Sequence, residues 1–318
     1  MERIEGYPRR PIGRDAAVTR SRGVAETGAL ARSRGVAEPR AVRRDLLAWY
    51  ATQGRDLPIR RAAGPWAVLV AEVMSQQTRI DRVGAYWERF VATYPTPATL
   101  AAAPLRDVLR AWSGLGYNRR AAALRDAAGA IVERHGGLVP RTVAELAALP
   151  GIGPYTARAV AAIAFGEPVA AVDVNVRRLV ERLAGRALAP REAQVEADRL
   201  VDPRRAADWT HAAMDLAATI CRRRAPLCGR CPISRRCASR GTPGEEARPR
   251  GAAQPFPETR RWLRGRLLAE IAAAEAEAWH PVEGSRGAHD AAAVREALAG
   301  LAADGLVELD TDGRARVR

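Results

Sequence analysis

Four cysteines, the only ones in the chain, lie in a single run of 17 residues with the spacing Cys-x6-Cys-x2-Cys-x5-Cys. Four thiolates this close in sequence can converge on one soft metal centre, either a 4Fe-4S cluster or a tetrahedral zinc ion. Zinc ribbons usually have two separated CxxC pairs, whereas this run has one. Disulfides are a poorer interpretation, because the arginine-rich N-terminus lacks the apolar segment of a signal peptide. The metal-ligand candidates are Cys221, Cys228, Cys231 and Cys237.

The cysteine run also contains six arginines and no acidic residue. Guanidinium groups gathered in one loop suit the phosphates of a nucleic acid backbone. The alternative is a solvated basic loop around a purely structural metal. The arginines are Arg222, Arg223, Arg224, Arg230, Arg235 and Arg236.

The composition also favours a polyanionic partner. The chain has 318 residues, is 47% hydrophobic, and carries a formal net charge of +15. No stretch approaches the ~20 apolar residues of a membrane span, so we expect a cytoplasmic globular protein, monomeric and without a membrane partner. All 51 basic residues are arginines. A reaction through a lysine Schiff base is therefore excluded.

The pattern from residue 41 to 238 predicts an all-α domain, because apolar residues recur at three- and four-residue spacing between glycines and prolines. Pro65 suits the first turn of one helix, and Thr142 with Glu145 forms a capping box for another. Residues 1–40, in which RSRGVAE occurs twice, read as a disordered basic tail.

A linker rich in Gly, Pro, Arg and Glu is predicted over residues 239–256, followed by a small module over 257–318. Helical patterns at 259–274 and 290–303 precede short apolar segments at 307–309 and 315–317, with a turn between them at 310–313. Two helices and a hairpin predict a winged-helix-like unit.

A glycine-rich hairpin, Leu149-Pro-Gly-Ile-Gly-Pro-Tyr-Thr-Ala157, lies between predicted helices at 143–149 and 155–165. Gly151 and Gly153 permit a tight turn whose backbone N–H groups can face a phosphate. The chain therefore has a candidate helix-hairpin-helix motif for DNA binding.

Six segments match a known pattern in order: RDLPIR at 55–60, AEVMSQQT at 71–78, WSGLGYNRRA at 112–121, LPGIGPYTA at 149–157, VDVNVRR at 172–178 and AAMDLAATIC at 212–221. With the cysteine run, they resemble the helix-hairpin-helix DNA glycosylases, and within these the MutY-type adenine glycosylases. The resemblance covers residues 43–237. It implies a two-lobed helical fold, a 4Fe-4S cluster on the four cysteines, and double-stranded DNA with a mismatch or oxidised guanine as partner.

Two carboxylates match the catalytic pair of that family. The residue matching Glu72 protonates adenine, and the one matching Asp173 stabilises the sugar cation. Glu72 lies two turns into the Pro65 helix above Val68 and Leu69, so its pKa should be raised by desolvation. Asp173 also suits a helix N-cap, a role that is compatible with catalysis. Asn175 matches an asparagine near the reacting nucleotide.

Tyr155 stands where the endonuclease III branch has its Schiff-base lysine, and tyrosine is found there in MutY-like enzymes. The resemblance therefore implies hydrolytic, monofunctional base removal. The lysine-free composition leads independently to the same expectation.

The resemblance also implies DNA contacts. Gln77 and Tyr117 match residues that wedge into the duplex near the orphaned base when the target nucleotide is extruded. Arg55 and Arg60 match arginines near the base pocket.

The chain departs from the MutY pattern at Ile59, Ser75 and Asn118, where tryptophan, leucine and tyrosine are usual. Only 81 residues follow Cys237, and they do not read as the Nudix-like domain of many MutY proteins. We expect removal of adenine opposite guanine or 8-oxoguanine in base excision repair. Two alternatives stay open: a thymine or uracil glycosylase acting on T·G or U·G mismatches, and a noncatalytic iron-sulfur DNA-binding protein.

Overall fold

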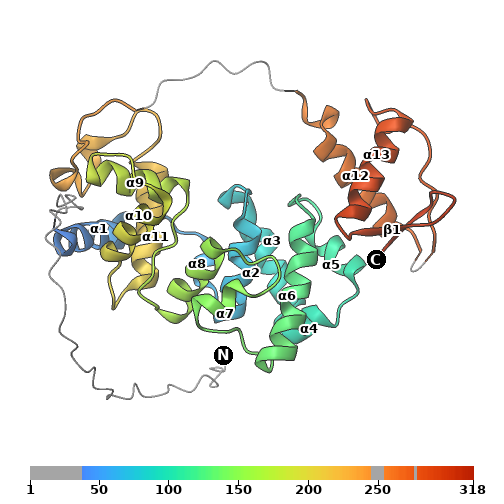
Figure 1. The fold of residues 1–318 in the computed structure, drawn as a ribbon, viewed down its shortest axis with the longest axis horizontal. Helices are drawn as coiled ribbons and strands as arrows, with labels where there is room; N and C mark the ends of the chain where they lie inside the picture. The colour runs from blue at the N-terminus through green and yellow to red at the C-terminus, as the bar shows by residue number, and fades with distance from the viewer. Residues whose placement is uncertain (1–37, 245–253, 276–277) are drawn as a thin grey trace, which may run out of the picture. The chain divides into compact units, whose positions relative to one another are not determined.

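The computed structural model describes residues 38–244, 254–275 and 278–318. Residues 1–37, with most of the predicted tail and its repeated heptapeptide, lie outside the described residues, as do residues 245–253 of the predicted linker. The described residues form thirteen α-helices, four short 3₁₀ helices and one small sheet (Figure 1). This agrees with the predicted helical fold. None of the described helices is long and apolar enough to cross a membrane.

The first hydrophobic cluster is built from consecutive helices in the middle of the chain. Its largest fully buried side chains include Trp112, Phe90 and Met74. The mid-chain helices that contribute to it are α2 (Pro65–Ser75), α3 (Ile80–Thr93), α4 (Pro97–Ala101), α5 (Leu105–Trp112), α6 (Arg119–His135), α7 (Val143–Ala147) and α8 (Pro154–Phe165), and C-terminal side chains such as Leu263 and Leu298 belong to the same cluster.

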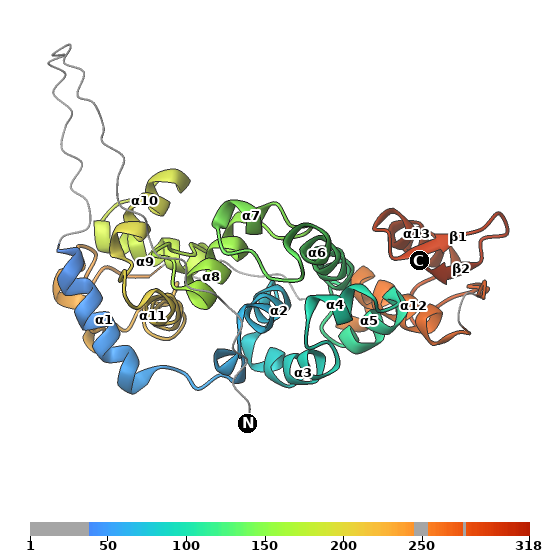
Figure 2. The ribbon, with the colours of Figure 1, turned by 90° about the horizontal axis from the view of Figure 1, so that it is seen from below.

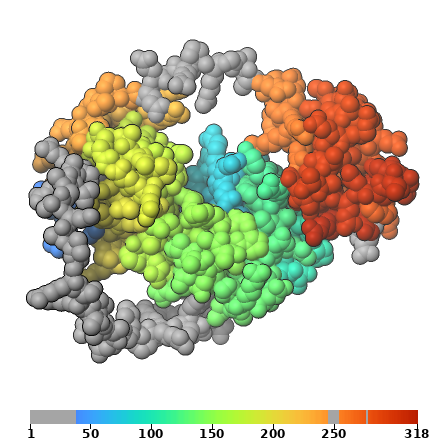
Figure 3. All heavy atoms as spheres, in the orientation of Figure 1, coloured from blue at the N-terminus to red at the C-terminus, as the bar shows by residue number. Residues whose placement is uncertain are grey.

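A second cluster joins the N-terminal helix to helices more than 120 residues later in the chain. Leu46 and Leu47 of α1 (Pro39–Gln53) are buried with side chains of α9 (Val174–Ala184), α10 (Pro190–Leu200) and α11 (Ala206–Thr219). Figures 1 and 2 both show α1 beside α11. On the face seen in Figure 3, green side chains of α7 and α8 adjoin the yellow ones of α9 and α10.

Helix α1 begins at Pro39, two residues before the predicted start of the helical domain at residue 41. Proline is favoured in the first helical turn because its fixed φ suits the helix and its missing N–H is not needed there. Burial of Val42, Leu46 and Leu47 then stabilises the helix against α10 and α11.

The other predicted helix signals are confirmed. Helix α2 begins at Pro65 after Gly64, whose φ is +88°. Thr142 and Glu145 form the predicted capping box at the start of α7, with Glu145 N donating to Thr142 Oγ1 at 3.2 Å. Helix α8 contributes Val160 to the first cluster and Ala162 to the second, so its small side chains lie between the two.

The C-terminal residues form the predicted elements. Helices α12 (Arg260–Ala273) and α13 (Ala291–Ala303) precede the antiparallel strands β1 (Val307–Leu309) and β2 (Ala315–Val317), with Glu308 opposite Arg316. Buried leucines of α12 and α13 belong to the same cluster as α5. Arg106 Nε and Arg110 Nε of α5 both donate to the Ala272 carbonyl at 2.9 Å. The division of the chain into separate domains stays a prediction.

Candidate functional site

Three predicted residues that are far apart in sequence lie near one another in the structure. Glu72 lies on α2, Tyr155 in the first turn of α8, and Asp173 directly before α9. Burial raises the pKa of the Tyr155 hydroxyl, and the negative charges of Glu72 and Asp173 raise it further. Both carboxylates therefore lie close enough to act on the same phenol.

Glu72 is partly enclosed by its own helix. The flanking residues Ala71 and Val73 are buried, while Glu72 keeps partial exposure to solvent. Burial raises the pKa of the Glu72 carboxyl from its ordinary value of 4.5 to about 7. A carboxyl with that pKa holds its proton for a large fraction of the time near neutral pH, so it can act as a general acid.

Asp173 caps helix α9 as the sequence predicted. Its Oδ1 atom accepts hydrogen bonds from the backbone N–H groups of Asn175 at 2.9 Å and Val176 at 2.7 Å. Its Oδ2 atom accepts from Asn175 Nδ2 at 2.7 Å. These three bonds fix the orientation of the Asp173 carboxylate.

Arg178 continues this network toward the cysteine run. Its Nη1 donates to Asn175 Oδ1 at 3.0 Å, and its Nε donates to the Cys221 carbonyl at 3.0 Å. Arg178 lies in the VDVNVRR segment, but the sequence analysis assigned it no role. Its contact with Asn175 could have been predicted from their three-residue spacing on a predicted helix, because such residues are neighbours on a helix surface.

The glycine hairpin joins α7 to α8 with two unlike glycines. Gly151 has a φ of +70°, and a Cβ atom there would lie 2.5 Å from the Ala123 side chain. Gly153 has an ordinary φ of −81°, caps α8, and has no atom within 4 Å of where a Cβ would be. Gly151 is therefore required by the turn, whereas Gly153 leaves the start of α8 open to approach.

The two predicted wedge residues share a rare backbone conformation. Gln77 has a φ of +53° and Tyr117 a φ of +52°, and both side chains are exposed. Non-glycine residues seldom adopt this left-handed region, and such strain persists only where neighbouring contacts enforce it.

Arg120 supplies those contacts, and the sequence analysis missed its role. Its guanidinium donates to the Met74 carbonyl at 2.8 Å and to the Gly116 carbonyl at 2.9 Å, and it also bonds to the Gln76 carbonyl. It thereby ties the end of α2 to the loop that carries Tyr117. Burial lowers the pKa of Arg120 to about 10, which leaves it charged at neutral pH.

Arg55 and Arg60 are held by a buried carboxylate. Asp215 of α11 is inaccessible to solvent and accepts from Arg55 Nε at 2.6 Å and Arg60 Nη2 at 2.7 Å. These ion pairs tie the segment after α1 to α11. Their predicted contact with DNA stays a prediction.

The four cysteines are free thiols that line one small cavity of about 20 Å³. Arg182 Nη1 lies 3.4 Å from Cys221 Sγ and donates to the Arg222 carbonyl at 2.7 Å. Burial raises the pKa of the Cys231 thiol to about 11, so a thiolate there needs a cation to stabilise it. The chemistry of the four thiol donors, rather than their arrangement in this structure, fits a soft metal centre.

The described ranges contain no group of three or more His, Cys, Asp or Glu side chains arranged to hold a metal ion. Five of the six loop arginines are exposed, as expected for a surface that meets phosphate. Arg236 differs, because it pairs with Asp45 at 3.4 Å and with Glu38, both from the region of α1.

Two of the three departures from the MutY pattern have local contacts. Ser75 Oγ donates to the Ala71 carbonyl at 2.7 Å in the last turn of α2. Ile59 is partly buried against the first hydrophobic cluster. Asn118 directly precedes α6, and its side chain makes no capping hydrogen bond.

Comparison with known proteins agrees with this geometry. Residues 70–203 match the HhH-GPD superfamily of base excision DNA repair proteins. A thermostable thymine-DNA glycosylase of known structure superposes with a TM-score of 0.59 at 28% identity, covering 63% of this chain and 95% of that one. A trapped endonuclease III–DNA covalent intermediate superposes with a TM-score of 0.55 at 25% identity, covering 62% and 93%. The class defined by fold and site is therefore that of helix-hairpin-helix base excision repair proteins.

A relative of known type narrows the class of DNA repair protein to which the chain belongs. The adenine DNA glycosylase of Mycobacterium tuberculosis strain H37Rv is 42% identical over 279 residues, which cover 85% of this chain and 91% of that protein. The chain belongs to the adenine DNA glycosylase family of the HhH-GPD superfamily.

Proposed function

We propose that the protein is a monofunctional DNA glycosylase of base excision repair that hydrolyses the N-glycosidic bond of adenine mispaired with guanine or 8-oxoguanine. The observation that carries the proposal is that Tyr155 lies within electrostatic reach of both Glu72 and Asp173. The extent of the match to an adenine DNA glycosylase supports adenine as the released base.

Glu72 is the proposed general acid. Adenine leaves more easily as a neutral molecule, so the base must gain a proton as the glycosidic bond breaks. The pKa of about 7 lets Glu72 carry that proton near neutral pH. A general acid typically contributes about 100- to 10,000-fold to the rate.

Asp173 is the proposed partner of the sugar. Loss of adenine leaves an oxocarbenium-like sugar cation, which a fixed carboxylate stabilises without reorganising. The hydrogen bonds from Asn175 and Val176 hold this carboxylate in place. Water completes the reaction and leaves an abasic site.

The strand should remain uncut. Tyr155 cannot form an imine, and the chain has no lysine that could replace it. We therefore expect no covalent amine-linked DNA complex when the protein is incubated with substrate duplex and borohydride. Trapping of such a complex would contradict a monofunctional mechanism.

The four cysteines are proposed to hold a 4Fe-4S cluster. The cavity that they line, together with Arg182 beside Cys221, suits a negatively charged sulfur-ligated centre. Such a cluster would fix the loop that carries the exposed arginines, and the bond-breaking chemistry stays with Glu72 and Asp173. Iron and zinc content per chain distinguishes the cluster from a zinc ion.

Duplexes carrying A·8-oxoguanine, A·G, T·G and U·G, treated with alkali after incubation, test the released base. Strand cleavage at adenine alone supports the proposal, and the ratio of the first two rates gives the preference for oxidised guanine. Cleavage at thymine or uracil alone would instead support the alternative suggested by the likeness to a thymine-DNA glycosylase. A noncatalytic protein would cleave none of them.

Glu72→Gln and Asp173→Asn complete the test. Both changes keep side-chain shape while removing the acid or the negative charge. We expect each to abolish most of the excision while DNA binding persists. Undiminished excision by the double variant would refute the assigned pair.

A further inference from the structure

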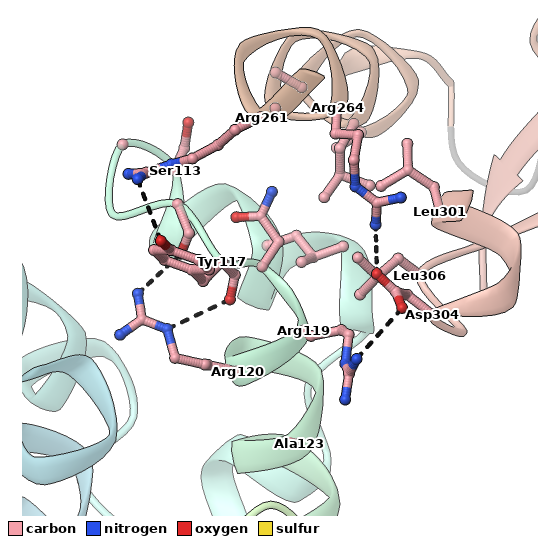
Figure 4. Close-up of a pocket in the computed structure, with 18 of the residues that line it drawn as sticks. Ser113, Tyr117, Arg119, Arg120, Ala123, Arg261, Arg264, Leu301, Asp304 and Leu306 are labelled. Atoms are coloured by element: carbon pink, nitrogen blue, oxygen red, sulfur yellow. Dashed lines mark hydrogen bonds and ion pairs between the residues drawn. The ribbon is translucent and has the colours of Figure 1, made fainter. Parts of the chain in front are cut away.

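A large cavity of about 1070 Å³ lies outside the site of Glu72, Tyr155 and Asp173. One wall consists of Gln77, the loop of Ser113 to Asn118, and the hairpin residues Pro150 to Ile152. The other wall belongs to α12 and the end of α13 (Figure 4). None of the three site residues lines this groove.

The groove is strongly cationic. Eight of its lining residues are arginines and only one, Asp304, is acidic. Asp304 is already engaged, because it pairs with Arg119 of α6 at 3.6 Å and with Arg264 of α12. The α12 wall carries Arg260, Arg261, Arg264 and Arg266.

Two of these arginines are free to meet an anion. Arg261 and Arg266 are exposed, and no carboxylate in the described residues forms an ion pair with either. Arg260, by contrast, pairs with Glu296 of α13 at 2.8 Å. Exposed, unpaired guanidinium groups lining one groove are suited to the phosphates of a nucleic acid strand.

Arg261 also contacts the predicted wedge. Its guanidinium lies 4.5 Å from the centre of the Tyr117 ring, and its Nη1 is 3.5 Å from the Tyr117 hydroxyl oxygen (Figure 4). Arg120 lies 5.4 Å from the same ring centre. A Cβ added to Gly116 would be 3.2 Å from Arg261 Nη2, so the loop approaches this arginine closely. Tyr117 is thus held by one guanidinium from each wall.

We infer that α12 completes a second DNA-binding surface, in which Arg261 and Arg266 hold backbone phosphates of the strand opposite the target adenine and Arg261 positions the Tyr117 wedge. The inference rests on the proposed function for the identity of the target base. The groove is lined by the predicted wedge residues Gln77 and Tyr117, but by none of Glu72, Tyr155 and Asp173. A duplex opened at the wedge would therefore place the unflipped strand on the groove side.

Binding of an uncleavable duplex, with a non-hydrolysable adenine analogue opposite guanine, tests the phosphate contacts. The double variant Arg261→Gln, Arg266→Gln should bind about 10- to 100-fold more weakly near physiological salt. Its plot of log affinity against log salt should be shallower by about 1.8, since each lost phosphate contact removes about 0.9. Arg295→Gln serves as the single-site control, because Arg295 is exposed on α13 and outside the groove. An unchanged salt slope in the double variant would overturn the inference.

Phosphate ethylation interference identifies the strand. Wild-type binding should be blocked by ethylation at phosphates opposite the adenine, and the double variant should lose that sensitivity. Sensitivity lost only on the adenine strand would contradict the proposed placement.

The positioning role is tested by 2-aminopurine placed beside the target base, whose fluorescence rises on unstacking. Arg261→Gln should reduce the rise at saturating protein, whereas Arg266→Gln should not. Equal responses would remove the positioning role. These binding readouts do not depend on which base is excised. A result that refutes DNA binding by the groove is therefore distinguishable from a result that refutes the proposed adenine excision.

Discussion

At the scale of single residues, the proposed site combines one carboxyl with a raised pKa and one carboxylate held in a fixed orientation. Glu72 is desolvated and has a pKa of about 7, while Asp173 accepts three hydrogen bonds that hold its carboxylate in place. Two carboxylates with opposed environments are a common division into acid and cation stabiliser. Their positions on α2 and before α9 make that division possible.

The raised pKa of Glu72 predicts that this residue lowers the free energy of unfolding by an amount that depends on pH. In the unfolded chain Glu72 ionises near 4.5, whereas in the folded protein it ionises near 7. Between these values the folded state holds a proton that the unfolded state has lost, so this group's contribution to stability falls as pH rises from 4.5 to 7. Glu72→Gln should therefore stabilise the protein by up to about 3 kcal/mol above pH 7 and by little at pH 4.5.

Urea unfolding at pH 5 and pH 8 measures this effect. The control is Glu88→Gln, which alters an exposed carboxyl of α3 and should change stability little at either pH. An equal effect of Glu72→Gln at both pH values would show that burial does not perturb Glu72 as described.

The same pKa predicts the alkaline limb of excision. Only the protonated form of Glu72 can donate, so the single-turnover rate should fall about tenfold per pH unit well above pH 7. Single-turnover rates on an A·G duplex from pH 6 to pH 9 give the profile. A flat profile over this range would argue against Glu72 as the acid.

At the scale of elements, the two glycines of the hairpin between α7 and α8 should affect different properties: Gly151 protein stability, and Gly153 mainly DNA binding. Gly151→Ala places a side chain at a φ of +70° and against Ala123, so it should lower both stability, by at least about 1 kcal/mol, and DNA affinity. Gly153→Ala has an ordinary φ and open space. It should leave the melting temperature nearly unchanged while weakening DNA binding.

Thermal unfolding and duplex affinity, measured on both variants, give the comparison. If Gly153→Ala bound DNA as tightly as the wild-type protein, the start of α8 would not be a phosphate contact. A matching loss of stability in the two variants would contradict the different demands on the two glycines.

At the scale of the whole molecule, the cysteine loop connects distant helices. Arg178 and Arg182 of α9 bond to Cys221 and its neighbours, and Arg236 pairs with Asp45 of α1. Cys228→Ser should therefore lower metal content, thermal stability and DNA affinity together. Iron analysis, thermal unfolding and duplex binding measure the three. A variant without metal that kept full DNA affinity would show that the loop does not need its centre to bind phosphate.

Short-range features of the sequence were predicted well. The capping box at Thr142, the start of α2 at Pro65, and strands β1 and β2 all occur where expected. Each depends on residues within a few positions of one another, where local propensity and hydrogen bonding decide the conformation. The burial of α1 against α10 and α11 is a long-range contact, which no local pattern specifies.

The family, the four candidate cysteine ligands and the candidate acid could be read from the sequence, because spacing and residue type specify them. Only the tertiary structure decided which groups meet. It tied Arg55 and Arg60 to Asp215, and it placed Arg261 over Tyr117. These pairs are separated by more than 140 residues, so their contacts follow from packing of the hydrophobic clusters and from pairing of charges. No local pattern records such pairing.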